Sequence, residues 1–327
     1  MKNLNSINKE IFPIGLGCMG MSDFYGNKST RNDAQSIETI KAALDAGINY
    51  LNTADYYGAG HNELLIREAV KDRKEKPLVA VKFGGLRTPS GGFTGIDTTP
   101  NAVKNFAAYT LTRLNVEAID IYLPGRINPA IPIEDTVGAI SDLIKEGKVK
   151  YLGLSEANAA AVRKAHSVYP VSVVEVEYSL ATRVIEKELL PVCRELGIGI
   201  TAYGVLSRGL LSGGMTGKFA AGDFRAFAPR FTGKNFEENQ KRIEVLKKLA
   251  EEKGCSPSQL AIAWVMNQGD DILPLLGTTK VSRLKEYLGA IDIKLTIEEM
   301  RKLSDSFPEG TFAGQRYDDN QMKIVVN

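Results

Sequence analysis

Eight short apolar segments alternate with amphipathic segments along this chain, and that alternation restricts its fold more than any other feature. The apolar segments have the length and composition of β-strands buried on both faces, and the segments between them repeat their apolar residues at the spacing of one helix face. Strands that alternate with helices form a parallel sheet covered by helices. Eight such units predict a closed (β/α)8 barrel, the TIM-barrel fold.

The boundaries of these segments can be read from the residue pattern. Strands are predicted near 14–18, 48–53, 78–82, 119–123, 149–154, 173–176, 198–203 and 272–276. Helices are predicted over 33–46, 62–70, 100–114, 133–145, 158–168 and 185–196, with another beginning at Pro257. No low-complexity linker interrupts the chain, so we expect a single domain over 1–327. The stretches 83–98 and 207–235 are rich in turn-forming residues and are predicted to be long loops, which in compact domains are usually functional lids or disordered.

Charge and composition exclude several classes of protein. The formal net charge is only +2 and no basic block stands out, so neither nucleic acid nor a membrane surface is an expected partner. No apolar run is long enough to span a bilayer, and the first residues lack the apolar core of a signal peptide. The three cysteines are widely spaced and the two histidines have no metal-ligand spacing. We therefore expect a cytoplasmic protein without disulfides or a bound metal.

The stretch IGLGCMG, residues 14–20, has the G-x-G-x-x-G spacing of a dinucleotide-binding Rossmann unit. Such a unit needs a helix that opens directly on the glycines and an acidic residue about 20 positions later at the end of a second strand. The sequence has neither feature, because helical periodicity resumes only near Asp33. We therefore expect these glycines to end the first barrel strand, where missing side chains leave room for a ligand.

Polar residues at the ends of the predicted strands are the candidates for chemistry, since active sites of such barrels lie at the carboxyl ends of the strands. Lys82 closes an apolar strand, so its ammonium is expected to be partly desolvated, unless it only extends to the rim. A nearby ammonium lowers the pKa of a tyrosine from about 10 and makes it a usable general acid, and Tyr57 is the candidate.

Near 277–283, hydroxyls and two cations before a helix suit a phosphate, although an ordinary loop explains them equally well.

Three stretches in these positions resemble the signatures of the aldo-keto reductases. NTADYYGAGHNE at 52–63 resembles D-T-A-x-x-Y-G-x-G-x-N-E, and the segments 132–156 and 277–286 resemble the second and third signatures of the family. The resemblance extends from about residue 14 to 291. It implies an NADP(H)-dependent oxidoreductase that reduces an aldehyde or ketone to an alcohol. The hydride would pass directly from the nicotinamide to the carbonyl carbon, without a metal.

The resemblance also implies roles for individual residues. Tyr57 matches the general acid and Lys82 the lysine that assists it, with Tyr203 stacked on the nicotinamide. Lys280 and Arg283 match the region that binds the 2′-phosphate and would select NADPH over NADH. The expected catalytic and substrate-binding residues are Tyr57, Lys82, Asn52, Gly125, Arg126 and Tyr25. The expected cofactor-binding residues are Cys18, Met19, Ser155, Glu175, Tyr203, Val205, Leu206, Ser207, Arg208, Thr278, Thr279, Lys280, Arg283 and Glu286.

Two departures from the family pattern affect the expected rate. Asn52 stands where the family has an aspartate, so Lys82 is expected to lack a negative partner, and Gly125 stands where it has a histidine. Loss of a donor that positions the substrate carbonyl can cost on the order of 10²-fold in rate. Altered substrate choice is the other expected outcome.

Two other functions therefore stay open. One is an NADPH-binding regulatory or sensor protein with weak turnover, which the residues at positions 52 and 125 suggest. The other is a phosphate-binding lyase or isomerase on the same barrel, with Lys82 as a Schiff-base lysine.

Overall fold

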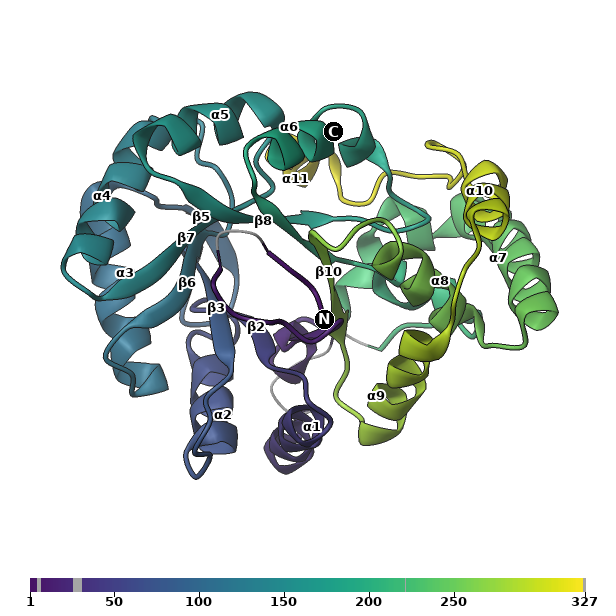
Figure 1. Ribbon diagram of the computed structural model, residues 1–327, viewed down its shortest axis with the longest axis horizontal. Helices are drawn as coiled ribbons and strands as arrows, with labels where there is room; N and C mark the ends of the chain where they lie inside the picture. Colours follow the sequence, from purple (N-terminus) through teal and green to yellow (C-terminus); the bar gives the residue numbers. More distant parts are fainter. Residues whose placement is uncertain (5–6, 26–30, 221, 326–327) are drawn as a thin grey trace.

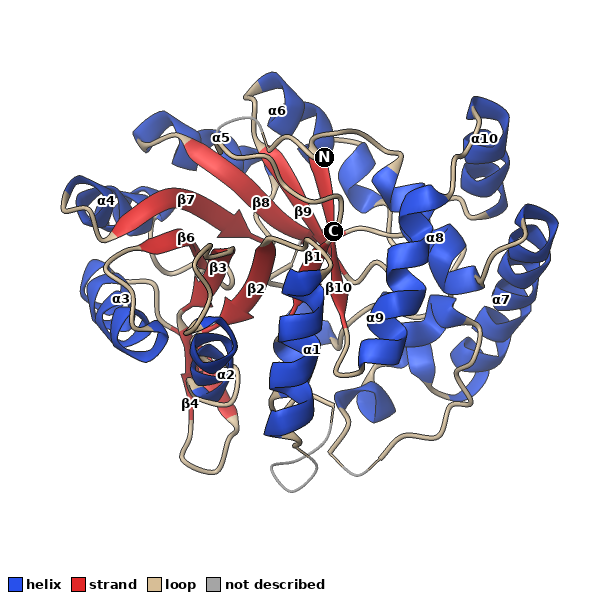
Figure 2. Ribbon diagram, turned by 60° about the horizontal axis from the view of Figure 1, so that its bottom comes forward, coloured by secondary structure: helices blue, strands red, loops and turns tan. Residues whose placement is uncertain are grey.

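The computed structural model describes the chain except residues 5–6, 26–30, 221 and 326–327. Within the described residues, eight parallel strands close into a barrel, in the order β1, β2, β3, β6, β7, β8, β9, β10 and back to β1. These strands are β1 Gly15–Gly17, β2 Tyr50–Ala54, β3 Leu78–Phe83, β6 Ile119–Pro124, β7 Val149–Ser155, β8 Val171–Glu177, β9 Gly199–Tyr203 and β10 Ile272–Gly277. Helices surround the barrel (Figures 1 and 2), which confirms the predicted (β/α)8 TIM-barrel fold.

Helix boundaries follow the local sequence closely. Thr99 caps the third helix by accepting a hydrogen bond from the backbone N–H of Ala102, and Pro100 occupies the first helical position. The helices of the described chain are α1 Asp33–Asp45, α2 His61–Val70, α3 Pro100–Leu114, α4 Ile133–Lys145, α5 Ala159–Val168, α6 Leu189–Glu195, α7 Gly233–Lys253, α8 Pro257–Met266, α9 Val281–Leu288, α10 Ile297–Ser306 and α11 Asp319–Met322. None of the helices in this part of the chain has the length and apolar character needed to cross a bilayer.

The two stretches predicted as loops are more ordered than expected. Residues 83–98 contain an antiparallel hairpin, β4 Gly85–Arg87 and β5 Phe93–Ile96, because Gly91 has the positive φ that a tight turn requires. Residues 207–235 contain three short 3₁₀ turns and the start of α7. The helix predicted over 185–196 is also corrected, since a 3₁₀ turn at Val184–Glu186 precedes the shorter α6.

The amino-terminal segment covers the end of the barrel at which the strands begin. Leu4, Ile7 and Ile11 are buried in one cluster with inward-facing strand residues such as Tyr50. Lys2 secures the segment by donating hydrogen bonds of 2.6 Å to the backbone carbonyls of both Met266 and Gly269. Ligand access is thereby left to the opposite end, where the strands finish.

Candidate active site

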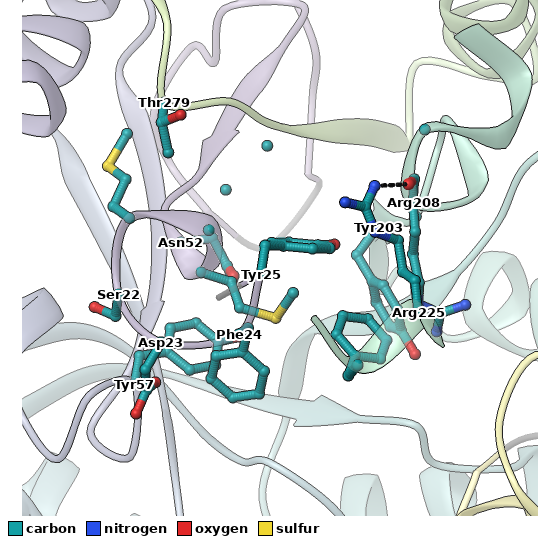
Figure 3. A pocket seen from close by; sticks show the side chains of 18 of the residues that line it. Ser22, Asp23, Phe24, Tyr25, Asn52, Tyr57, Tyr203, Arg208, Arg225 and Thr279 are labelled. Atoms are coloured by element: carbon teal, nitrogen blue, oxygen red, sulfur yellow. Dashed lines mark hydrogen bonds between the residues drawn. The ribbon is translucent and has the colours of Figure 1, made fainter. Parts of the chain in front are cut away.

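A cavity of about 1700 Å³ opens at the carboxyl ends of the barrel strands. Its walls come from the ends of β2, β3, β6, β8, β9 and β10, the β4–β5 hairpin, the loop after β9 and the carboxyl-terminal segment. Figure 3 shows Asn52 and Tyr57 on one side of this cavity, Tyr203 and Arg208 on the other, and Tyr25 between them. The Arg225 guanidinium lies 4.8 Å from the centre of the Tyr25 ring. Tyr25 pairs as an isolated β-bridge with Asp223, so the loop after β9 crosses the cavity to meet the loop after β1.

Most of the candidate residues chosen from the sequence line this cavity. They are Met19, Tyr25, Asn52, Tyr57, Lys82, Gly125, Arg126, Glu175, Tyr203, Val205, Leu206, Arg208, Thr278, Thr279, Lys280 and Arg283. Four candidates are absent from that lining: Cys18, Ser155, Ser207 and Glu286. Cys18 is fully buried, and burial raises the pKa of its thiol to about 12, which fits the apolar filler role better than a ligand role. Glu286 accepts a hydrogen bond from Ser256 and pairs with Arg283.

Lys82 does have a negative partner, contrary to the expectation from Asn52. The Lys82 ammonium lies 2.9 Å from Glu175 Oε1 and donates a hydrogen bond of 2.6 Å to Asn52 Oδ1. Asn52 Nδ2 in turn donates to Glu175 Oε2 at 2.5 Å, so the three side chains form a closed triangle. All three are at most 4% exposed, where an unpaired charge would be costly. The sequence reasoning was wrong because Glu175 comes from β8, which does not neighbour β2 or β3 in the barrel.

Tyr57 lies beside this triangle, in the turn after β2. The Lys82 ammonium is 5.2 Å from the centre of the Tyr57 ring. Burial raises the pKa of Tyr57 well above its usual value, Glu175 raises it further, and Arg126 opposes the rise. The predicted lowering by Lys82 is therefore not the dominant effect, because burial has the largest influence on the pKa of Tyr57. Tyr57 is consequently a protonated hydroxyl at the cavity wall.

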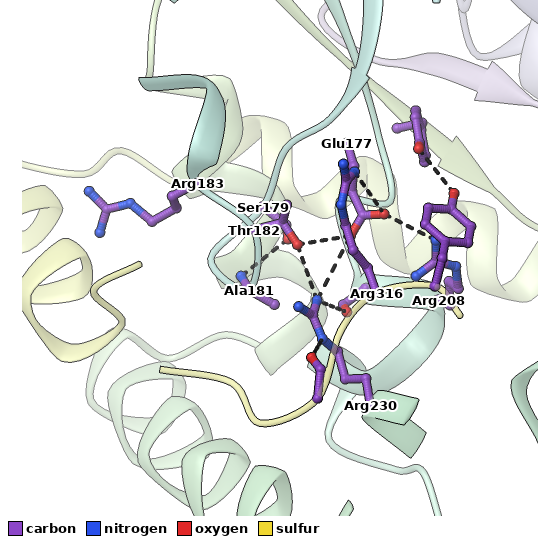
Figure 4. Close-up of polar contacts among 12 residues, drawn as sticks. Glu177, Ser179, Ala181, Thr182, Arg183, Arg208, Arg230 and Arg316 are labelled. Carbon is purple, nitrogen blue, oxygen red and sulfur yellow. Dashed lines mark hydrogen bonds and ion pairs between the residues drawn. The ribbon is translucent and has the colours of Figure 1, made fainter. Parts of the chain in front are cut away.

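A network of arginines around Glu177 fixes the loop after β9 (Figure 4). Glu177 is fully buried and pairs with Arg208 at 3.1 Å, Arg316 at 3.6 Å and Arg230 at 3.8 Å. Burial alone would raise the pKa of Glu177, but the three guanidinium groups outweigh it and lower the pKa to about 2. The network thus holds residues from two separate segments against the end of β8.

The loop after β9 bends sharply where the resemblance places the pyrophosphate. Ser207 and Arg208 have φ values of 44° and 55°, in the left-handed region that residues with side chains seldom adopt. Such strained positions concentrate at ligand-binding sites. Arg208 is not free to move, because its side chain pairs with Glu177 and stacks 4.4 Å from the centre of the Tyr317 ring.

The carboxyl-terminal segment contributes residues that the sequence reasoning missed. Tyr203 Oη donates a hydrogen bond of 2.8 Å to Glu156 Oε1 and lies 3.0 Å from Tyr317 Oη. Arg316 pairs with Glu156 at 3.1 Å. The segment carries none of the three family signatures, so no motif pointed to Arg316 and Tyr317. Tyr56 also lines the cavity and was not among the candidates chosen from the sequence.

The far end of the cavity has the polar groups expected for a phosphate. Lys280 precedes α9 and is exposed, and Arg283 lies on the first turn of that helix. Helix amino termini with nearby cations bind anions, since the unpaired N–H groups and the helix dipole favour negative charge. In the part of the chain that the structure describes, no cluster of three or more His, Cys, Asp or Glu residues could hold a metal ion.

Comparisons with known proteins give the same family at the level of sequence and of fold. The model of the aldo/keto reductase family matches residues 13–306. A probable aldo-keto reductase 1 of Glycine max is 41% identical over 312 residues, which is 94% of this chain and 89% of that protein. The structure of the glycerol dehydrogenase AKR11B4 from Gluconobacter oxydans superposes with a TM-score of 0.85 at 29% identity, covering 93% of this chain and 94% of that one.

A more distant structure adds a ligand-bound example of the same fold. It is an aldo/keto reductase from Klebsiella pneumoniae in complex with NADP and acetate, with a TM-score of 0.72 at 22% identity, covering 94% of this chain and 95% of that one. The family match over most of the chain and the close relative in Glycine max carry the assignment. This chain belongs to the aldo-keto reductase family of oxidoreductases.

Proposed function

We propose that this protein reduces an aldehyde or ketone to the alcohol with NADPH. The observation that carries the proposal is the placement of Tyr57 beside the Lys82–Glu175 ion pair in the wall of one large cavity. The cavity continues from these residues to Lys280 and Arg283, a continuous path for an extended dinucleotide. The Klebsiella pneumoniae relative, solved with NADP, supports this choice of cofactor.

The residues present fit a nicotinamide dinucleotide. Ser155 does not itself line the cavity, but it pairs in register with Glu175, which does. Its Oγ is buried with no hydrogen-bond partner among the described residues, and it would accept from or donate to the carboxamide. Tyr203 lines the cavity and would lie against the nicotinamide ring, while Val205, Leu206 and Arg208 would face the pyrophosphate. Lys280 and Arg283 would hold the 2′-phosphate. Glu175 already bonds Lys82 and Asn52 through both oxygens, so we assign it to the lysine rather than to the carboxamide.

The proton transfer falls to Tyr57. When bound, the cofactor supplies the hydride to the carbonyl carbon. The Tyr57 hydroxyl donates its proton to the carbonyl oxygen, and the phenolate that remains is stabilised by the positive charges of Lys82 and Arg126. Asn52 and Glu175 hold the Lys82 ammonium in position for this role. Gly125, Arg126 and Tyr25 are the proposed substrate-side residues, since all three line the cavity.

Neither alternative is favoured by this geometry. A weakly active sensor was suggested partly by a Lys82 without a negative partner, and Glu175 removes that reason. A Schiff-base lysine must present a free amine to a carbonyl, whereas the Lys82 nitrogen is engaged by both Glu175 and Asn52.

The function is tested by incubating the purified protein with NADPH and a panel of aldehydes and ketones. We expect cofactor oxidation that depends on the carbonyl compound and yields the alcohol in equal amount. Tight NADPH binding without oxidation by any compound of the panel would instead favour the sensor. Failure to bind NADPH at all would exclude both.

A further inference from the structure

The ring of Tyr56 occupies the space that a side chain at position 125 would need. A Cβ added to Gly125 would lie 2.5 Å from Tyr56 Oη and 3.0 Å from Tyr56 Cε1. The family's histidine therefore cannot be accommodated here while Tyr56 keeps its position. Glycine at position 125 and the Tyr56 ring are therefore structurally linked, because the ring fits only where position 125 has no side chain.

A second glycine makes room for the same ring. A Cβ added to Gly85 would lie 2.7 Å from Tyr56 Cδ1 and 2.8 Å from Tyr56 Cγ. Neither Gly85 nor Gly125 has a positive φ, so the backbone conformation does not require glycine at either position. The close approach of the Tyr56 ring accounts for both. Gly85 begins β4 and Gly125 follows β6, so the ring is accommodated by two separate segments.

The Tyr56 hydroxyl is available to a ligand. Tyr56 lines the cavity together with Tyr57, Lys82 and Gly125. Its Oη makes no hydrogen bond to any of the described residues, although the ring itself is held edge-on by Tyr57 at 5.2 Å and by Phe93 at 5.9 Å between ring centres. Burial raises the pKa of Tyr56, which keeps the hydroxyl protonated and able to donate.

We propose that Tyr56 is a catalytic residue that contacts the substrate and donates a hydrogen bond to its carbonyl oxygen, in place of the histidine that the family has at position 125. The proposal rests on the proposed function. Two donors then meet the carbonyl oxygen: Tyr57, which transfers its proton, and Tyr56, which orients the carbonyl and stabilises developing negative charge. Loss of one such donor costs on the order of 10²-fold in rate.

The first test is Tyr56→Phe, which removes the hydroxyl and keeps the ring. We expect kcat/KM for an aldehyde that wild type reduces to fall by roughly 10- to 100-fold, with NADPH affinity and melting temperature little changed. Tyr151→Phe is the matched control, because Tyr151 packs against the core cluster in the barrel and does not line the cavity. Tyr56→Phe with wild-type kcat/KM would overturn the proposal, and so would a loss fully explained by lower stability or weaker NADPH binding.

The second test exchanges the donor. Gly125→His in the wild-type background should lose activity, because the new side chain collides with the Tyr56 hydroxyl. In Tyr56→Ala, where the ring is gone, the same Gly125→His change should raise kcat/KM instead. The same sign of effect in both backgrounds would contradict the assignment. If wild type itself reduced no carbonyl compound, the proposed function would fail, whereas loss of the Tyr56 effect alone leaves that function intact.

Discussion

The carboxylate of Glu175 on β8 lies 2.9 Å from the ammonium of Lys82 on β3, across the mouth of the barrel. Asn52 bridges the two, so the negative charge that the family carries at position 52 is carried at position 175 in this chain. Lys82 therefore has a carboxylate partner although its neighbour on β2 is an amide.

Exchanging the two polar groups tests this relationship. Glu175→Gln leaves Lys82 buried beside two amides, so we expect the protein to lose about 3 kcal/mol of unfolding free energy, within the range found when one member of a buried pair is removed. Adding Asn52→Asp in the same molecule should recover most of the stability and of kcat/KM. Urea unfolding and steady-state kinetics measure both quantities. If the double variant were no more stable and no more active than Glu175→Gln alone, a carboxylate at position 52 could not replace the one at position 175.

The Glu177 network predicts a dependence of stability on acid. The pKa of Glu177 is lowered to about 2, so its contribution is complete above the ordinary pKa of glutamate, near 4.5, and is lost as the pH falls toward 2. The shift corresponds to about 3 kcal/mol over that window. Glu177→Gln should flatten this part of the curve of unfolding free energy against pH. The exposed Glu117→Gln serves as control and should leave the slope unchanged.

Lys280 and Arg283 are proposed to distinguish NADPH from NADH. Arg283→Ala should weaken NADPH binding by roughly tenfold, as expected for loss of one charge-assisted contact to phosphate, and should leave NADH affinity almost unchanged. Fluorescence titration with each cofactor measures the ratio. Lys285→Ala, an exposed cation on the same helix, is the control. An unchanged ratio in Arg283→Ala would remove the selection role from this residue.

Arg126 predicts a preference for substrates that carry a negative charge. Among the described residues, the other guanidinium groups that line the cavity each pair with a carboxylate, whereas Arg126 donates to the backbone carbonyl of Gly125 and has no such partner. We expect 4-oxobutanoate to be reduced with a higher kcat/KM than butanal. Arg126→Met should remove most of that difference, largely through KM for the anionic aldehyde. Equal kcat/KM values for both aldehydes in wild type would contradict the expectation.

Local features of the fold could be predicted because the residues that cause them are adjacent in sequence. Thr99 followed by Pro100 is a local signal for the start of a helix, and α3 begins there. The helix Ile133–Lys145 was predicted with the bounds that the structure shows. The helix α7 was missed since few of its residues are buried, which leaves a weak apolar pattern. The break before α6 was missed because Ile185, Leu189 and Val192 keep the spacing of one helix face across it.

The candidate site was harder to predict, because its contacts join positions far apart in the chain. Tyr57 and Lys82 lie in or near recognisable motifs, so they could be selected from the sequence alone. The pairing of Lys82 with Glu175 depends on which strand ends face each other across the barrel, and no local pattern contains that information. The position of Tyr317 depends on how the carboxyl-terminal segment folds back over the cavity.

The role of Tyr57 as proton donor is the central claim, and a single-turnover measurement tests it most directly. Wild type and Tyr57→Phe are each saturated with NADPH and mixed with an aldehyde that wild type reduces, and NADPH oxidation is followed in time. Loss of the general acid should slow oxidation by roughly 10²- to 10⁴-fold, while the dissociation constant of NADPH stays close to that of wild type. A Tyr57→Phe protein that oxidises NADPH at nearly the wild-type rate would contradict the account.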